Sequence, residues 1–461
     1  MGASGYELIV CLTTRMAEIL PIAGGHARER HPGEGMCMTA VPVATSALSM
    51  RIADVLRAGS VRSVFQPIVD MDTGAVTAYE ALARGPWGPL EGPLELFGAA
   101  REEGLLAELD EACRMAAFRG ALELGLTAPL TLFVNVEPEV LDAAPLEGLL
   151  RIADLVPGDL RVVLEITERA LAARPAELLR TVERVRALGW GVALDDVGAD
   201  SASLTFMALL RPDVVKLDLR LIQDRPSPAV AQIMNAVNAY AERSGALLLA
   251  EGIETEAHVA AARALGATLG QGWFYGRPTE TPDLRLPVEA LALPEAVRPA
   301  AGAPASPFSM LPAGVVLRRS SKRLLVELSK HLEREAMTLG ETCLIASTFQ
   351  HKEHFTPATV RRYRELVAQD GFVCVLGEGL SQTPVQGLRG ATLELDDPVC
   401  GEWDVVVLSP HFSAALLARD LGYDGPDMER MFEYALTYDR ETVTRAAHEL
   451  VSRVTPSVCP S

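Results

Sequence analysis

The chain has 461 residues, of which 49% are hydrophobic, 22% charged and 5% aromatic, so more than one domain with mainly aliphatic cores is expected. Its formal net charge of −19 argues against a general nucleic-acid binder, which needs a positive surface to displace counterions. The 7 cysteines include no CxxC pair, which argues against a disulfide framework or a structural zinc site. No apolar run is long enough to span a membrane, and a cytoplasmic protein is expected.

The first part of the chain falls into two segments. Residues 1–50 show little periodicity and are expected to form a partly disordered N-terminal extension. Residues 51–285 alternate short apolar runs with amphipathic stretches such as Ala176–Leu188 and Val230–Arg243. This alternation predicts an α/β fold whose parallel strands close into a barrel. The expected strands are Val64–Val69, Val76–Leu82, Leu132–Val136, Val162–Ile166, Gly191–Leu194, Val214–Leu217, Ala246–Ala250 and Gly272–Tyr275.

The rest of the chain predicts a linker and a smaller domain. Residues 286–313 are rich in Pro and Ala and are expected to form an extended linker. A second alternation of apolar runs predicts a compact α/β domain over residues 314–455. Its expected helices are Lys322–Leu339, Thr356–Gln369, Ala414–Leu421 and Met428–Val454, and its expected strands are Leu344–Thr348, Phe372–Leu376, Thr392–Leu395 and Val405–Leu408.

Nearly every apolar run of the barrel region ends in, or is interrupted by, a polar residue. The set comprises Glu80, Asn135, Glu165, Asp195, Asp196, Lys216, Glu251 and Gln271. Because the C-terminal ends of barrel strands converge on one face, these side chains are expected to meet there. The carboxylates alone would repel each other, and divalent cations would remove that repulsion. Oxygen donors suit Mg²⁺ or Mn²⁺ rather than a metal that prefers thiolates.

Two such cations could clamp the attacking and leaving oxygens of a phosphate diester. Lys216 could then orient the attacking water, and Glu251 could accept its proton. Each residue alone has a simpler interpretation, since Asp195 and Asp196 could form an acidic turn and Lys216 could extend from a strand end into solvent. The joint pattern, a polar group at one strand end after another, favours the catalytic interpretation.

Residues 64–276 resemble the EAL-domain family of cyclic di-GMP phosphodiesterases. The resemblance is carried by Phe65-Gln66-Pro67-Ile68-Val69-Asp70, Tyr79-Glu80-Ala81-Leu82-Ala83-Arg84, Val134-Asn135-Val136, Leu164-Glu165-Ile166-Thr167-Glu168, Leu194-Asp195-Asp196, Val215-Lys216-Leu217-Asp218, Ala250-Glu251-Gly252-Ile253-Glu254 and Gly270-Gln271-Gly272. The resemblance implies a modified TIM barrel with one antiparallel strand, hydrolysis of cyclic di-GMP to linear pGpG, two Mg²⁺ or Mn²⁺ ions per site, and a homodimer formed through the barrel.

The resemblance also implies a role for each matching residue. Glu251 and Lys216 would be catalytic, handling the attacking water. The expected metal ligands are Glu80, Asn135, Glu165, Asp195 and Asp196. The expected substrate contacts are Gln66, Arg84 and Gln271, and Glu168 and Glu254 would support the loops of the site.

One loop departs from the pattern of the family. Active members usually read Phe-Gly-x-Gly-Tyr-Ser-Ser-Leu after the Asp pair, whereas this chain has Val197-Gly198-Ala199-Asp200-Ser201-Ala202-Ser203-Leu204. Asp200 removes backbone freedom and adds a negative charge near the metals. A second interpretation therefore stays open, a catalytically weak or inactive cyclic di-GMP receptor or signalling scaffold.

Residues from about 318 to 425 resemble the DICT family of sensory domains. The resemblance is carried by Leu344-Ile345-Ala346-Ser347-Thr348-Phe349-Gln350, Tyr363–Leu366, Phe372-Val373-Cys374-Val375-Leu376-Gly377 and Trp403-Asp404-Val405-Val406-Val407-Leu408-Ser409. The resemblance implies that this domain regulates the barrel and receives an unidentified signal or protein partner. No nucleic-acid or membrane partner is expected.

Overall fold

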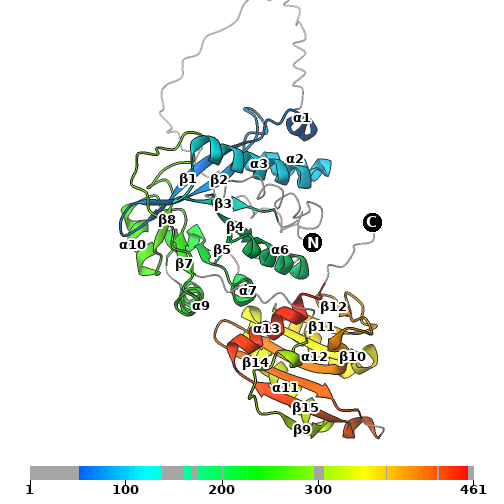
Figure 1. Ribbon diagram of the computed structural model, residues 1–461. Coiled ribbons are helices and arrows are strands. Elements are labelled where there is room, and N and C mark those ends of the chain that lie inside the picture. The colour runs from blue at the N-terminus through cyan, green and yellow to red at the C-terminus, as the bar shows by residue number, and fades with distance from the viewer. Residues whose placement is uncertain are drawn as a thin grey trace, which may run out of the picture.

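The computed structural model describes residues 51–137, 160–167, 174–198, 202–225, 227–294, 306–369, 371–422 and 425–454. The expected N-terminal extension at 1–50 lies outside the described residues, as does Glu168. Figure 1 shows a barrel, coloured blue to green, above a smaller domain coloured yellow to red.

The first domain is a closed barrel in which the strands follow one another in sequence order from β1 to β8. The strands are β1 (Arg62–Asp70), β2 (Val76–Arg84), β3 (Thr131–Asn135), β4 (Arg161–Thr167), β5 (Gly191–Val197), β6 (Val214–Leu217), β7 (Leu247–Ala250) and β8 (Leu269–Gln271). Strand β1 pairs antiparallel with both β2 and β8, and the other neighbours pair parallel. The expected TIM-like barrel with one antiparallel strand is confirmed.

Helices lie on the outside of the barrel (Figure 1). They are α1 (Ile52–Arg57), α2 (Pro93–Glu103), α3 (Leu106–Leu124), α6 (Pro175–Ala187), α7 (Ala202–Leu210), α8 (Leu219–Gln223), α9 (Pro228–Ser244) and α10 (Glu256–Ala264). The ends of α9 follow from its sequence, because Ser227 caps the first turn, Pro228 occupies the first position, and Gly245 ends the helix at φ 74°. Across the described parts of the chain, every helix is too short or too polar to cross a bilayer.

The interior of the barrel is a layer of buried side chains, one from each strand. They are Ile68, Ala78, Phe133, Val163, Ala193, Val214, Leu249 and Leu269. Leu291, which follows the barrel in the chain, joins this cluster and is 2% exposed. Because side chains along a strand alternate between its two faces, the residues two positions away from this layer also point inward.

The second domain is a seven-stranded sheet with the order β12-β11-β10-β13-β14-β15-β9. Its strands are β9 (Arg318–Ser321), β10 (Leu344–His351), β11 (Phe372–Glu378), β12 (Arg389–Thr392), β13 (Glu402–Leu408), β14 (Ser413–Asp420) and β15 (Met431–Thr437). Its helices are α11 (Lys322–Leu339), α12 (Pro357–Val367) and α13 (Arg440–Val451), and 3₁₀ turns include η2 (Phe308–Met310) and η3 (Gly340–Thr342). This arrangement confirms a smaller C-terminal α/β domain.

Four of the expected elements are wrong in detail. The last barrel strand is Leu269–Gln271, and the residues expected as that strand, Gly272–Tyr275, form a bend and turn. The expected helix Ala414–Leu421 is strand β14, and the expected helix Met428–Val454 divides into β15 and α13. The strand expected at Thr392–Leu395 ends at Thr392.

The described ends of the expected linker pack against the two domains. Before the linker's central part, Val288 bridges to Val76 at the start of β2. After it, the backbone N–H of Phe308 donates to Glu402 Oε2 on β13 at 3.0 Å. The domain limits at 51–285 and 314–455 stay a prediction.

Candidate active site

The polar residues predicted at the strand ends lie one step above the interior layer of the barrel. Counting two residues along each parallel strand from that layer reaches Glu80, Asn135, Glu165, Asp195, Lys216, Glu251 and Gln271. Strand β1 runs in the opposite direction, so the same end of the barrel is reached two residues before Ile68, at Gln66. Gln66 pairs directly with Glu80. The period of two along each strand therefore brings these side chains to one end of the barrel.

Lys216 lies at the centre of this cluster and is 1% exposed. Its Nζ lies 2.7 Å from Glu165 Oε1, 2.8 Å from Glu251 Oε1 and 3.0 Å from Asp195 Oδ1. Glu80 Oε1 is farther from the same nitrogen, at 3.7 Å. Burial alone would lower the pKa of Lys216, but the surrounding carboxylates raise it well above its usual value. Lys216 is therefore charged in the folded protein.

The pKa values of the buried carboxyl groups shift in different directions. Burial raises the pKa of Glu165 and Glu251 well above the usual value, and the negative charges of Glu80 and Asp195 add to this, whereas Lys216 opposes it. Burial acts on Glu80 in the same direction, but Lys216 and hydrogen bonds hold its pKa below the usual value. The donors to Glu80 are Asn135 Nδ2 at 2.9 Å and Gln271 Nε2 at 2.7 Å.

A bulge in β5 turns Asp195 and Asp196 to the same side. Adjacent residues of a regular strand point to opposite faces. Here the register slips, since Leu194 pairs with Val215 and Val197 pairs with Leu217, which leaves one extra residue on β5. Asp196 takes up the slip at φ 56°, in the left-handed region where aspartate is one of the tolerated residues. As a result, carboxylate oxygens of Asp195, Asp196 and Glu251 lie within 4.8 Å of one another.

The cluster has the chemistry of a divalent-cation site. One ammonium faces four carboxylates, those of Glu80, Glu165, Asp195 and Glu251. The carboxylate of Asp196 lies beside two of them, so a bound divalent cation would offset the excess negative charge. Among the described residues, Glu165 Oε2 and Glu251 Oε2 are buried and accept no hydrogen bond. Buried oxygens without donors fit a hard cation such as Mg²⁺ or Mn²⁺.

Three predicted site residues lie at the edge of the cluster or outside it. Gln66 accepts a long hydrogen bond from Gln271 at 3.4 Å. Arg84 is half-buried and donates to the carbonyl of Ala83 at 2.7 Å. Glu254 is exposed, and its carboxylate makes no hydrogen bond or ion pair with any part of the chain that the structure describes. The supporting roles of Glu254 and Glu168 stay predictions.

Sequence reasoning missed one basic residue near the Asp pair. Arg220 in α8 donates to Asp218 Oδ1 at 2.9 Å, and Asp218 also caps the start of α8. The hydrogen bond that Arg220 donates to Asp218 raises the pKa of Arg220, and the negative charge of Asp196 contributes to the rise. The stretch Val215-Lys216-Leu217-Asp218 carries part of the resemblance to the EAL family, but the Arg two residues later lies outside it and has no sequence signal of its own.

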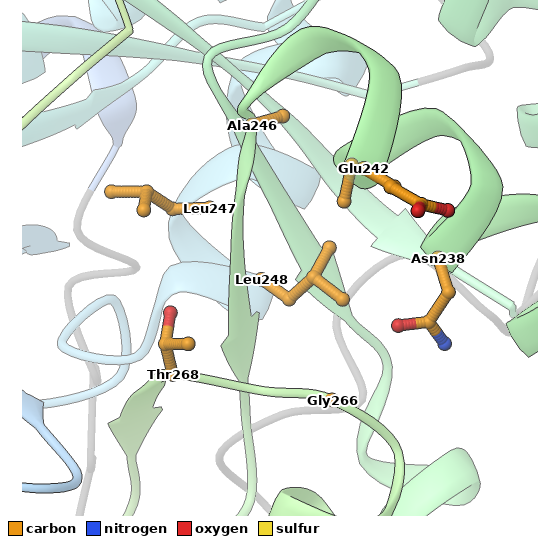
Figure 2. Close-up of a pocket in the computed structure, with 8 residues that line it drawn as sticks. Asn238, Glu242, Ala246, Leu247, Leu248, Gly266 and Thr268 are labelled. Carbon is orange, nitrogen blue, oxygen red and sulfur yellow. The ribbon is translucent and has the colours of Figure 1, made fainter.

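A pocket lies elsewhere on the barrel (Figure 2). It has a volume of about 420 Å³ and is lined by Asn238, Ala241, Glu242, Ala246, Leu247, Leu248, Gly266 and Thr268. These residues lie around the beginning of β7, whereas Glu251 follows the end of that strand. Glu242 is the one ionisable residue of its lining and is exposed, so this pocket does not share the chemistry of the cluster.

Comparisons with known proteins agree with both domains. Residues 49–278 match the model of the EAL domain, and residues 311–421 match that of DICT, described as a sensory domain in diguanylate cyclases and two-component systems. The cyclic di-GMP phosphodiesterase RocR of Pseudomonas aeruginosa is 30% identical over 252 residues, 49% of this chain and 60% of RocR. The cyclic di-GMP phosphodiesterase NbdA of the same organism is 32% identical over 245 residues, 51% of this chain and 31% of NbdA.

A solved structure also matches the chain. It is BlrP1 of Klebsiella pneumoniae in a complex with manganese and cyclic di-GMP at pH 9.0, with 28% identity and a TM-score of 0.44 over 48% of this chain and 56% of that chain. The match spans less than two thirds of the length of each of these relatives.

Proposed function

The chain belongs to the EAL-domain family, and from this premise we propose that it hydrolyses cyclic di-GMP to linear pGpG with two divalent cations, Mg²⁺ or Mn²⁺. The observation that supports the proposal is the convergence of Glu165, Asp195 and Glu251 on the ammonium of Lys216 at the strand ends. A phosphate diester is an anion, so it would be repelled from this end of the barrel unless cations were bound there.

The residues that would hold the cations are the expected ligands. They are Glu80, Asn135, Glu165, Asp195 and Asp196, and the distances place Glu251 close to the Asp pair as well. When bound, the cations would stabilise charge on the phosphate and make water more acidic. Since Asn135 Nδ2 donates to Glu80, its Oδ1 is the atom that can face a cation.

In the proposed reaction, the oxygen of a water molecule bonds to one phosphorus atom and the bond from phosphorus to the 3′ oxygen breaks, which leaves a 5′-phosphate on the linear product. Glu251 accepts the proton of the water, because its carboxylate lies beside Asp195 and Asp196, which would hold the cations. Lys216, 2.8 Å from Glu251, would hold the water in place. The leaving 3′ oxygen takes up a proton from solvent, and Glu251 afterwards releases the proton of the water to solvent. Gln66, Arg84 and Gln271 would contact the substrate.

Incubation of the full chain with cyclic di-GMP tests this proposal. With Mg²⁺ or Mn²⁺ present, chromatography should detect pGpG, and excess EDTA should abolish its formation because the carboxylates then repel the substrate. Restoring the cation should restore turnover. Tight binding of cyclic di-GMP in EDTA, without turnover in either metal, would contradict the proposed hydrolysis. It would favour the alternative that the chain is an inactive cyclic di-GMP receptor.

The C-terminal domain is proposed to regulate the barrel through α7. This helix follows the loop after the Asp pair, and its buried residues include Phe206, which packs edge-to-face on Phe372 of β11 at 5.1 Å. Thr205 Oγ1 donates to the carbonyl of Glu341 at 3.2 Å. Arg211, just after α7, forms an ion pair with Glu441 of α13 at 2.8 Å. Figure 1 shows α7 beside the second domain. A signal that shifts this domain would therefore act on the segment that follows Asp196.

Phe372→Leu is expected to lower turnover by about 2- to 30-fold, because the ring that holds Phe206 in place is lost. Steady-state kinetics of cyclic di-GMP hydrolysis measures the effect. Phe432→Leu is the matched control, since Phe432 is also a buried phenylalanine of the second domain but packs against Trp403. Equal turnover in both variants would contradict coupling through α7.

The homodimer also stays a proposal. Because the second domain of the same chain covers α7, a dimer through the barrel would have to use another face of it. The signal or protein partner of the second domain is unidentified.

A further inference from the structure

The loop between β2 and α2 holds a tryptophan in solvent. Trp87 is 74% exposed. The guanidinium carbon of Arg62 lies 4.2 Å from the centre of its ring. Such a contact contributes only about 0.5–1 kcal/mol at an exposed site, so it does not account for leaving the rest of a large apolar side chain in water.

Arg62 is itself held in place on the other side. Its Nη2 lies 3.0 Å from Glu91 Oε1, its Nη1 forms an ion pair with Glu280, and its Nε donates to the carbonyl of Gly85 at 3.2 Å. One face of the Trp87 ring is therefore backed by a fixed guanidinium while most of the side chain is open to solvent. A flat ring held in this way loses little conformational freedom when a ligand stacks on it.

Trp87 and Arg62 lie in line with the candidate active site. Arg62 pairs directly with Arg84, four residues along both strands from the pair of Gln66 and Glu80. Residues four apart on a strand point to the same face, and they are separated by about 13 Å at about 3.3 Å per residue. Burial lowers the pKa of Arg84, the charge of Arg62 lowers it further, and Glu91 and Glu80 act in the opposite direction. Arg84 therefore interacts electrostatically both with Arg62, which backs Trp87, and with Glu80 of the carboxylate cluster.

We propose that Trp87, backed by Arg62, is a stacking platform for a guanine base of cyclic di-GMP and so determines substrate specificity. This inference rests on the proposed function. Every nucleobase has a flat π face that stacks on aromatic rings, and guanidinium groups add to such stacks. About 13 Å of strand separates the pair of Gln66 and Glu80 from the pair of Arg62 and Arg84. This distance leaves room for one ligand to have a phosphate near the carboxylates and a base on Trp87. Arg84, between them, can face the phosphate.

Steady-state kinetics with the full chain and Mn²⁺ tests the platform. Trp87→Ala is expected to raise KM for cyclic di-GMP about tenfold with kcat unchanged, because the stacking contact is the same in the ground and transition states. Trp87→Phe should keep most of the affinity. Leu94→Ala is the matched control, since Leu94 is also a large apolar side chain, 46% exposed, on neighbouring α2. Hydrolysis of bis(p-nitrophenyl) phosphate, a diester without a base, should be equal in all variants.

A second readout does not depend on turnover. Cyclic di-GMP mixed rapidly with the wild-type protein in Mn²⁺ should quench tryptophan emission before it is hydrolysed, and Trp87→Phe should remove that change although Trp190, Trp273 and Trp403 remain. An unchanged KM in Trp87→Ala with a fully active wild type would overturn the platform alone. A similar loss with the base-free diester would also overturn it. A wild type that neither binds nor hydrolyses cyclic di-GMP would overturn the platform and the proposed function together.

Discussion

Lys216→Met is expected to lower turnover of cyclic di-GMP roughly 100- to 1,000-fold and the free energy of unfolding of the metal-free protein by about 3–5 kcal/mol. The ammonium is the positive charge within 3.0 Å of Glu165, Glu251 and Asp195. Its removal leaves buried carboxylates facing one another without a counter-charge. Urea denaturation in EDTA measures the stability, and pGpG formation in Mn²⁺ measures the turnover.

Addition of Mn²⁺ separates the two effects of this substitution. The cation should restore part of the lost stability of Lys216→Met, because it supplies positive charge to the same carboxylates. It should not restore turnover, because the group that positions the water is still missing. Lys216→Arg is the control, since it keeps the charge in a planar and larger group. Wild-type stability of Lys216→Met in EDTA would contradict the shared charge of the cluster.

Glu80→Gln is expected to lower turnover roughly 100- to 1,000-fold with little change in the fold. The substitution removes the negative charge of a carboxylate whose pKa is held low by Lys216 and by hydrogen bonds. The amide oxygen of the new side chain can still accept a hydrogen bond from Asn135 or from Gln271. Since Glu80 is an expected cation ligand, the rise in Tm on adding Mn²⁺ should be smaller than in the wild type. Thermal denaturation over a series of Mn²⁺ concentrations measures this rise.

Glu251→Gln provides the contrast that separates a ligand from a base. Turnover should fall roughly 100- to 10,000-fold because the proton acceptor is lost. Raising the Mn²⁺ concentration should recover part of the turnover of Glu80→Gln and none of that of Glu251→Gln. Equal recovery in both variants would contradict the division of roles and would favour Glu251 as a cation ligand, as its distance to Asp195 and Asp196 allows.

Much of the candidate site could be predicted because barrel strands have a local signal. Each parallel strand carries an apolar residue that fills the barrel and, two positions later, a polar residue at its end, as in Val163 and Glu165 or Val214 and Lys216. The interval of two residues is a property of any strand and needs no knowledge of the partner strand. The barrel and the convergence of these side chains could therefore be derived before any contact was seen.

The incorrect helices of the second domain show where local signals fail. Ala414–Leu421 is rich in alanine and leucine, which favour a helix. In the structure this segment is β14, which pairs with β13 and β15 and is buried along most of its length. Pairing on both edges and burial on both faces outweigh the intrinsic preference for a helix. Neither partner lies within the segment, so its own residues could not indicate the strand.

The amino-acid order alone determined which chemical groups this protein brings to its strand ends, since strand periodicity and residue type are local properties. Only the tertiary structure decided that a bulge turns Asp195 and Asp196 to one side, that Lys216 is the shared partner of the carboxylates, and that the second domain covers α7. The stacking of Trp87 on Arg62 was likewise decided only by the tertiary structure. Each depends on contacts between residues far apart in the chain, whose energies arise only when the folded chain brings them together.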